Sequence, residues 1–280
     1  MPHLAKSDIL SGLQCHKRLW WERHDPEASE LVKSPVLVAR LEESRRVGIL
    51  AREHAPGGRL IGVPHWAVAE RVAATRDALA DNPDRLYEAA FQAEGVFAAV
   101  DILERLPDGT WGMVEVKSAA SVKEEHLPDV AVQVHVLRST LAVSRAEVMH
   151  VNRDCRHPDL STLFVRNDVT PVVEALVLGI PDAAADLKRM LAGPLPGVPI
   201  GAHCNEPREC PFKSRCWSGL PEHHVGTLHR IGAKAWTLRA QGYERVADLP
   251  RDMRLSATQR RQRRAVESGA LVVEPELAEG

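Results

Sequence analysis

A chain of 280 residues can bury one sizeable hydrophobic core and still carry an appended module. It is 44% hydrophobic and 26% charged, as ordinary soluble globular proteins are, and its net charge of −2 does not by itself indicate nucleic-acid binding. The sequence has no run of about 20 apolar residues that could span a bilayer, and its opening residues contain no apolar signal region. We therefore expect a cytoplasmic protein without a membrane partner.

Two helices are predicted in the first part of the chain. Ser7 and Asp8 form a helix-start signal, and apolar residues at helical spacing follow, so a short helix is predicted to bring Cys15 into the fold. A second helix is predicted to begin after Ser34, its N-cap, and to end at a Pro-Gly-Gly stop signal, with His54 near its end. A short strand and a third helix are predicted at 59–63 and 66–79.

The centre of the chain predicts a β-hairpin. The apolar segments EGVFAAVDILERL and WGMVEVKSA flank a Pro-Asp-Gly turn, the composition expected of a hairpin. If the turn centres between Asp108 and Gly109, Asp101 lies opposite Glu115 and Val116 to within one residue. An aspartate within the otherwise apolar VFAAVDIL is costly to bury without a cation or a partner.

The second strand of this hairpin places two charged side chains together. Side chains alternate along a strand, so Glu115 and Lys117 share one face, while Val114 and Val116 point into the core. Carboxylates so placed are hard oxygen ligands for Mg²⁺ or Mn²⁺, and such an ion can activate water for displacement at phosphorus. Lys117 is placed to orient that water or to neutralise charge on the phosphate. The alternative is a solvated strand face, where these residue types are common.

Asp101 on one strand, Glu115 and Lys117 on the next, and Gln133 on the following helix resemble the core of the PD-(D/E)XK nucleases, and within them the RecB-type branch. The resemblance implies an α/β fold, a mixed central sheet flanked by helices as in restriction endonucleases. It implies that Asp101, Glu115 and Val116 bind Mg²⁺ or Mn²⁺, and that Gln133 orients the site. The branch usually has an aromatic residue four positions after the glutamine, where this chain has a leucine.

Two further candidates complete the predicted site. RecB-type nucleases carry a metal-site histidine on an early helix, and His54 is the candidate for it. Glu88, in the first strand of the sheet, is a candidate additional acid. The alternatives are that His54 is a surface residue and that Glu88 is an exposed strand residue.

The rest of the sheet and its helices follow Lys117. A helix is predicted from Asp129 to Leu141, with an apolar stripe that packs on the sheet. Strands are predicted at 146–151 and 162–165, helix signals resume from Asp168 and Thr170, and a helix is predicted at 182–191. A linker rich in Pro and Gly, AGPLPGVPIGAH, then marks a change in composition.

Three of the five cysteines, Cys204, Cys210 and Cys216, recur at six-residue intervals in HCNEPRECPFKSRCW. A cytosolic compartment keeps thiols reduced, so the pattern indicates metal thiolates rather than disulfides. Zinc ribbons prefer Cys-x-x-Cys pairs, which this segment lacks, whereas iron-sulfur clusters use four thiolates at varied spacings. The alternatives are His203, next to Cys204, as a rival ligand, zinc in place of iron, and no metal.

One cysteine before the nuclease core and three after it resemble the iron-sulfur nucleases of the RecB-type branch, which include CRISPR-associated adaptation nucleases and AddB-type helicase-nuclease subunits. The resemblance makes Cys15, Cys204, Cys210 and Cys216 the ligands of a 4Fe-4S cluster and leaves out Cys155. The cluster would act as a staple that closes a long loop of the chain.

The C-terminal part of the chain is basic. From Val225 to Val266 there are ten Lys or Arg against three Asp or Glu, a balance that attracts phosphate backbones, although a solvated helical face is the alternative. VGTLHRIGAKAWTLRAQGYERVADL resembles a helix-hairpin-helix element, with Ile231, Gly232 and Lys234 in its hairpin. The glycine lets backbone N–H groups approach a phosphate, and the lysine adds charge.

The sequence therefore predicts an iron-sulfur nuclease domain at 1–222, with its core at about 34–166 and cluster segments at 7–23 and 203–217, followed by a basic all-α module at 223–280. The expected activity is metal-dependent hydrolysis of DNA, preferably single-stranded, in repair or in CRISPR or phage defence, with a helicase or defence complex as a partner. The alternatives are a non-catalytic iron-sulfur DNA-binding subunit and an RNA-processing nuclease.

Overall fold

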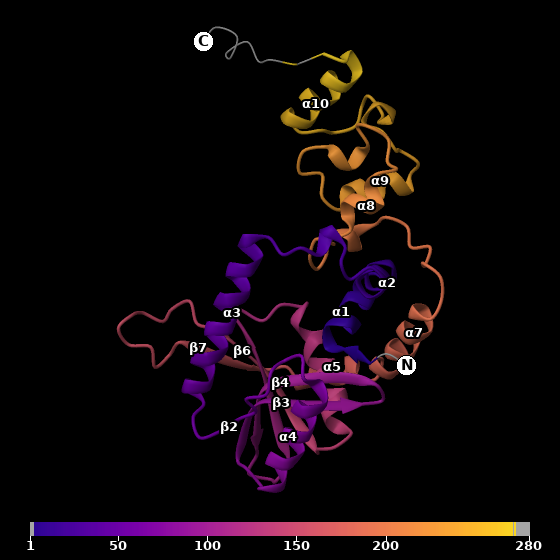
Figure 1. The fold of residues 1–280 in the computed structure, drawn as a ribbon. Helices are drawn as coiled ribbons and strands as arrows, with labels where there is room; N and C mark the ends of the chain where they lie inside the picture. Colours follow the sequence, from indigo (N-terminus) through magenta and orange to yellow (C-terminus); the bar gives the residue numbers. More distant parts are fainter. Residues whose placement is uncertain (1–2, 271, 273–280) are drawn as a thin grey trace. The chain divides into compact units, whose positions relative to one another are not determined.

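The structure, a computed structural model, describes residues 3–270 and 272 and contains two compact units, residues 1–198 and 199–280 (Figure 1). The sequence-based prediction places the boundary after residue 222, whereas the second unit already begins at residue 199. Trp217, for example, belongs to the second unit, where its ring packs edge to face against that of Trp236, with centroids 5.7 Å apart. The end of the predicted module, at 271 and 273–280, lies outside the described residues. In the described part of the chain, no helix is both long and apolar enough to cross a bilayer.

A mixed seven-stranded sheet forms the centre of the first unit, in the order β2-β3-β4-β5-β6-β7 with β1 paired to β4. The β3–β4, β4–β5 and β6–β7 pairs are antiparallel, and the β1–β4, β2–β3 and β5–β6 pairs are parallel. The strands are β1 (Leu4–Ala5), β2 (Arg59–Leu60), β3 (Arg85–Ala93), β4 (Val96–Arg105), β5 (Trp111–Lys117), β6 (Val143–Val151) and β7 (Phe164–Asp168). The predicted α/β class and mixed sheet are therefore confirmed.

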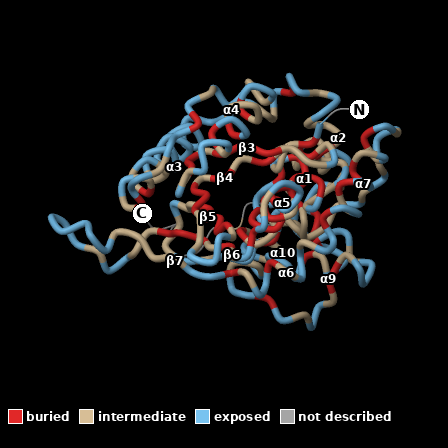
Figure 2. The backbone as a smooth tube through the Cα atoms, turned by 90° about the horizontal axis from the view of Figure 1, so that it is seen from below, coloured by how far each residue is buried: buried red, intermediate tan, exposed pale blue. Residues whose placement is uncertain are grey.

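Helices flank this sheet on both faces. One face packs against α5, whose Val130, Val134 and Leu137 are buried as the apolar stripe predicts, and the other receives Ala51 and Ala55 from the end of α3. The first half of α3 is exposed, as Figure 2 shows. The helices of this unit are α1 (Lys6–Gln14), α2 (His16–His24), α3 (Pro35–His54), α4 (Val68–Ala80), α5 (His126–Arg138), α6 (Thr170–Val177) and α7 (Ile180–Leu191), and the segment Ser29–Leu31 forms the 3-10 turn η1.

The N-terminal segment forms two helices where one was predicted. Cys15 has an extended backbone, with φ −164° and ψ 119°, and serves both as the C-cap of α1 and as the N-cap of α2. The second predicted helix begins as expected, because the Ser34 side chain accepts a hydrogen bond from the backbone N–H of Leu37 at 3.2 Å. Pro35 occupies the first position of α3, where it interrupts no helical hydrogen bond.

The second unit is a helical region around a small core of its own. Val225, Leu228, Leu238, Val246 and Leu249 are buried together. The expected hairpin precedes α9, and Gly232 has a φ of +55°, but the first helix of the expected element is only a 3-10 turn. The elements are η2 (Ala202–Cys204), α8 (Lys213–Trp217), η3 (Val225–Thr227), α9 (Lys234–Ala240), η4 (Val246–Asp248) and α10 (Ala257–Ser268).

Candidate active site

The strands β4 and β5 separate at Asp101. Their ladder pairs Ile102 with Val114, which places Asp101 opposite Glu115 as the sequence predicts. Beyond Ile102 the ladder stops, and the backbone N–H of Val116 donates to Oδ2 of Asp101 at 2.7 Å instead. The strand β1 takes the place of β5 beside the first residues of β4. Asp101 therefore lies where β4 exchanges one neighbouring strand for another.

The side-chain alternation of β3 and β4 changes phase at facing positions, Glu88 and Asp101. On β4, Val100 and Leu103 pack in one core cluster and Ile102 in the other, so the strand turns over at Asp101. The pairs on either side of Glu88 keep one register, and Glu88 has a φ of +57°, which is rare for a residue other than glycine. Such a conformation costs on the order of 1–3 kcal/mol and persists where the surrounding structure holds it.

The predicted acid, lysine and glutamine converge on one face of the sheet. Lys117 Nζ lies 2.7 Å from Oε1 of Glu115, and Gln133 Nε2 donates to Oε2 of the same carboxylate at 2.8 Å. Glu115 is 5% exposed and Gln133 is fully buried. The strand β5 and the helix α5 thus bring together three of the side chains that the sequence singled out.

Two functional groups in this cluster were missed in the sequence. Asp129, four residues before Gln133 on α5, makes a short ion pair with Lys117. Lys6 Nζ lies 2.6 Å from Oδ1 of Asp129 and 3.3 Å from Oε1 of Glu115. Two ammonium groups therefore share two buried carboxylates. The spacing of four residues between Asp129 and Gln133, one turn of a helix, was the signal that could have found Asp129.

Lys6 reaches the cluster because the start of the chain joins the sheet. Leu4 is fully buried and pairs with Val96 of β4, and Lys6, two residues later, begins α1. The carboxylate of Asp8 caps this turn by accepting from the backbone N–H of Ala5 at 2.6 Å. Since the pairing of Leu4 with Val96 links residues far apart in the sequence, no local pattern around Lys6 predicts its place.

The pKa values of two carboxyl groups at the site, Asp101 and Asp129, are shifted in opposite directions. Burial, together with the negative charge of Glu115, raises the pKa of Asp101 to about 8, although Lys6 opposes this shift. Burial would also raise the pKa of Asp129, but the charges and hydrogen bonds of Lys6 and Lys117 lower it below its usual range. The positive charge near Asp101 therefore does not offset its burial and the charge of Glu115. The positive charge around Asp129 more than offsets its burial.

The donor set suits a small divalent cation. Mg²⁺ and Mn²⁺ are held by one or two carboxylates and leave other positions to water and phosphate, and Asp101 and Glu115 supply two carboxylates at the point where the strands diverge. A raised pKa on a partly buried acid next to another acid is the condition that a cation relieves. Among the described residues, no group of three His, Cys, Asp or Glu side chains is placed to hold a metal ion, so backbone and water ligands would complete this site.

His54 lies on the other side of its helix from the pocket at Asp101. Its Nε2 lies 2.7 Å from the backbone oxygen of Leu160, and its ring meets Phe164 edge to face at 5.1 Å. Those partners belong to β7 and to the loop before it. The pocket at Asp101 is lined by other residues of α3, among them Arg45, Ile49 and, two positions before His54, Arg52. The structure therefore does not bring His54 to Asp101 and Glu115.

Glu88 pairs with arginines rather than with the other acids. Its Oε1 lies 3.1 Å from Nη1 of Arg52, and its Oε2 lies 3.6 Å from Nη2 of Arg71. Glu88 lies in the first long strand of the sheet as predicted, and it lines the same pocket as Asp101. Its carboxylate is engaged by guanidinium groups, which makes it a neighbour of the site rather than a cation ligand.

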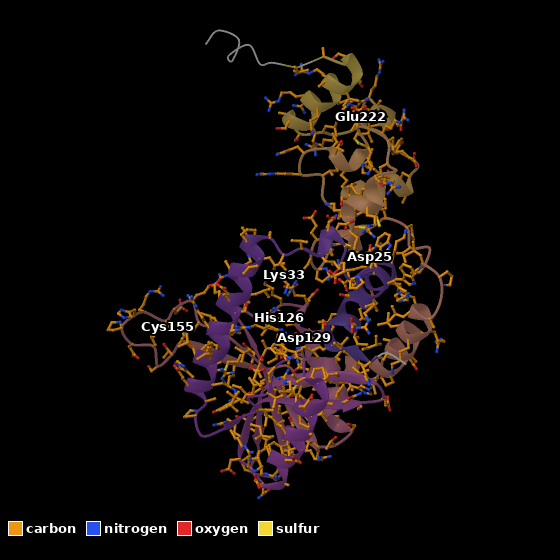
Figure 3. The ribbon with its side chains drawn as sticks, in the orientation of Figure 1. Asp25, Lys33, His126, Asp129, Cys155 and Glu222 are labelled. Atoms are coloured by element: carbon orange, nitrogen blue, oxygen red, sulfur yellow. The ribbon has the colours of Figure 1, made fainter. Side chains whose placement is uncertain are left out.

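The cysteines are divided between the two units. Cys15 lies between α1 and α2, and Cys204, Cys210 and Cys216 lie in the second unit, where the N–H of Cys210 donates to the C=O of Cys204 at 2.9 Å. None of the five cysteines forms a disulfide in the described residues, and no three of them form a metal cluster there. Cys155 lies in the loop between β6 and β7 that projects from the sheet, away from Asp129 (Figure 3).

The predicted hairpin residues lie in the second unit. Ile231, Gly232 and the neighbouring Arg230 line a pocket of about 280 Å³, and Lys234 begins α9. Beyond it, α10 carries four arginines, of which Arg260 and Arg263 donate to backbone carbonyls of Leu255 and Leu249. Arg251 and Arg264 line a second pocket of about 670 Å³ with these arginines. The positive charge predicted for this segment is therefore exposed on its surface.

Comparisons with known proteins give little further information. No protein-family model and no curated protein matches the sequence. One solved structure, described as "Crystal structure of SSO0001", aligns over 78% of this chain and 87% of its own with 13% sequence identity and a TM-score of 0.38. A likeness this weak carries no argument about function, so the conclusions below depend on the residues themselves.

Proposed function

We propose that this chain is a metal-dependent nuclease of the RecB-type PD-(D/E)XK branch that hydrolyses phosphodiester bonds in DNA, preferably single-stranded. The observation that carries the proposal is the convergence of Asp101, Glu115, Lys117 and Gln133 at the point where β4 and β5 separate. The basic surface of the second unit supports a nucleic-acid substrate.

Asp101 and Glu115, with the backbone of Val116, would hold Mg²⁺ or Mn²⁺. The bound cation would supply activation of water and neutralisation of charge at the phosphate. Lys117, beside Glu115, holds an ammonium group where charge develops during displacement at phosphorus. Gln133 orients the Glu115 carboxylate through its hydrogen bond, and Asp129 fixes the position of the Lys117 ammonium.

A 4Fe-4S cluster on Cys15, Cys204, Cys210 and Cys216 belongs to the same proposal. Four thiols that form no disulfide are a soft donor set suited to iron. No step of the hydrolysis is assigned to this cluster. Iron and sulfide analysis of protein purified without oxygen tests it, and four irons per chain are expected. Zinc in their place would contradict the assignment.

The activity is tested by cleavage of end-labelled strands. Wild-type protein is incubated with single-stranded DNA, duplex DNA and RNA of the same sequence, with Mn²⁺ or with EDTA, beside Lys117→Ala. We expect Mn²⁺-dependent cleavage of single-stranded DNA that the variant loses. Cleavage of RNA alone would indicate an RNA-processing nuclease, and binding of DNA without any cleavage would indicate a non-catalytic DNA-binding subunit. Exposed Lys33, replaced as Lys33→Ala, is the control for loss of a positive charge.

A further inference from the structure

A pocket of about 370 Å³ lies beside Asp101, on the α3 and α4 side of the site. Its ionisable lining comes from five different parts of the first unit: Arg45, Arg52, His65, Arg71, Glu88 and Asp101. Three guanidinium groups thus face two carboxyl groups, one of which belongs to the proposed cation site. The pocket and the hydrolytic site are therefore adjacent and have a common wall at Asp101.

Two of these arginines bracket one carboxylate. Nη1 of Arg52 lies 3.1 Å from one oxygen of Glu88, and Nη2 of Arg71 lies 3.6 Å from the other. The Glu88 side chain is 37% exposed, so water screens these ion pairs and weakens them. The single negative charge of Glu88 cannot neutralise the positive charges of two guanidinium groups. Positive charge therefore remains available to a second anion.

Arg71 is held in the pocket at a cost in unsatisfied hydrogen bonds. It is 6% exposed, its Nη2 donates to the backbone oxygen of Glu88 at 3.1 Å, and its Nε has no partner among the described residues. A buried donor without an acceptor is unfavourable by about 1–3 kcal/mol. Arg71 lines the pocket, so an oxyanion there would interact with the positive charge of its guanidinium group.

The backbone of Glu88 is part of this arrangement. Its φ of +57° occurs at the strand position that faces Asp101, where both strands change phase. The strained residue therefore connects the arginine pair to the acid of the hydrolytic site. Strain of this kind gathers at functional sites because the surrounding contacts hold it there.

We propose that this pocket binds a phosphate group of the nucleic-acid strand next to the one that is hydrolysed, with Arg52 and Arg71 as its donors. The planar guanidinium group matches phosphate better than a point charge does. Glu88 holds the two arginines in place, and the bound phosphate replaces Glu88 as the acceptor of some of their hydrogen bonds. The inference rests on the proposed function, since the neighbouring hydrolytic site defines which phosphate is bound.

The test uses single-stranded DNA oligomers that differ only in the position of one uncharged methylphosphonate linkage. Affinities are measured in Ca²⁺, without Mg²⁺ or Mn²⁺, by fluorescence anisotropy with the full chain. For wild type, one linkage position is expected to weaken binding by about tenfold. Arg52→Ala and Arg71→Lys should bind the charged strand more weakly and lose this position-specific penalty.

Two further variants make the outcome decisive. Arg76→Ala removes a guanidinium group from the exposed side of the same helix as Arg71 and should keep the penalty. Glu88→Gln should tighten binding of the charged strand, because it frees both arginines. A penalty that persists unchanged in Arg52→Ala and Arg71→Lys, or weaker binding in Glu88→Gln, would overturn the proposal.

The measurement does not depend on cleavage. A wild-type protein that shows the penalty but hydrolyses no DNA contradicts the nuclease proposal and leaves the phosphate pocket in place. A wild-type protein that cleaves DNA but shows no penalty at any position contradicts the pocket alone.

Discussion

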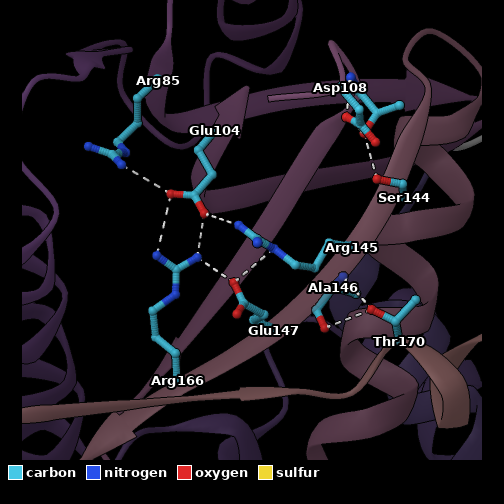
Figure 4. A network of polar contacts seen from close by, with 10 residues as sticks. Arg85, Glu104, Asp108, Ser144, Arg145, Ala146, Glu147, Arg166 and Thr170 are labelled. Carbon is cyan, nitrogen blue, oxygen red and sulfur yellow. Dashed lines mark hydrogen bonds and ion pairs between the residues drawn. The ribbon is translucent and has the colours of Figure 1, made fainter. Parts of the chain in front are cut away.

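Asp101 and Glu104 lie three residues apart on β4, and both are carboxyl groups largely removed from water. Glu104 accepts hydrogen bonds from Arg85, Arg145 and Arg166, which come from three other strands (Figure 4). Burial would raise the pKa of Glu104, but the hydrogen bonds and charges of Arg166 and Arg85 lower it. For Asp101 burial and the charge of Glu115 act in the same direction, and its pKa rises to about 8.

We infer that this difference separates an acid with a structural role from an acid with the proposed functional role. The network around Glu104 joins β3, β4, β6 and β7, and it gives both of its acids cationic partners within the fold, since Arg145 and Arg166 also contact Glu147. Among the described residues, no lysine or arginine forms an ion pair with Asp101, whose pKa is raised instead. Buried charge that the fold satisfies by itself indicates stability, whereas buried charge that it leaves unsatisfied indicates a ligand.

The largest expected effect is on cleavage. Asp101→Asn keeps the size of the side chain and an oxygen for the N–H of Val116, but it removes the charge that binds the cation. We expect the rate of DNA cleavage in Mn²⁺ to fall by about a thousandfold, the equivalent of about 4 kcal/mol in the barrier. Glu104→Gln is the matched control, and its cleavage rate should stay within about threefold of wild type when measured below its melting temperature. Equal losses in both variants would contradict the comparison.

Stability should show the reverse order. Glu104→Gln removes the buried acid that three arginines share and leaves their partly exposed guanidinium groups close to one another, so the free energy of unfolding should fall by about 2 kcal/mol. Urea denaturation of the metal-free protein measures it. Asp101→Asn should not lower the free energy of unfolding at pH 7. A loss in Asp101→Asn as large as that in Glu104→Gln would show that both acids are structural.

The pH dependence of stability distinguishes the two acids further. The pKa of Asp101 is raised in the fold, so its stabilising contribution is complete below about pH 4, the region of its unfolded pKa, and is lost as the pH rises through about 8. Metal-free wild type should therefore lose stability relative to Asp101→Asn between these values. Urea titrations at a series of pH values measure the difference. A difference that does not change with pH would contradict the raised pKa.

A substitution of Lys6 tests how the charge balance around Glu115 and Asp129 affects ligand binding. Lys6→Gln leaves Glu115 and Asp129 with one ammonium group instead of two. We expect Mn²⁺ to bind about tenfold more tightly, because the site is more negative, and DNA in Ca²⁺ to bind about tenfold more weakly, because phosphate is repelled. Electron paramagnetic resonance and fluorescence anisotropy measure the two affinities. Lys6→Arg should restore both, and two changes of the same sign would contradict this role.

The sequence predicts the hairpin, Glu115, Lys117 and Gln133 because strand alternation and turn composition are local properties. It does not predict the place of Lys6, which depends on the pairing of β1 with β4. The sequence analysis also proposes His54 as the residue of this helix at the site, whereas the structure places Arg52 in the wall of the pocket at Asp101. Residues two apart on a helix point about 200° away from each other, and the exposed, weakly amphipathic α3 carries no pattern that shows which side faces the sheet. Long-range pairing and helix rotation are therefore what the sequence leaves open.

The most direct test of the account is Mn²⁺ binding to wild type, Asp101→Asn and Glu104→Gln, measured by electron paramagnetic resonance at pH 7.5 without DNA. We predict that wild type and Glu104→Gln bind the ion with the same affinity and that Asp101→Asn loses this binding. Unchanged Mn²⁺ binding in Asp101→Asn, or an equal loss in Glu104→Gln, would contradict the claim that the unsatisfied acid on β4 marks the cation site.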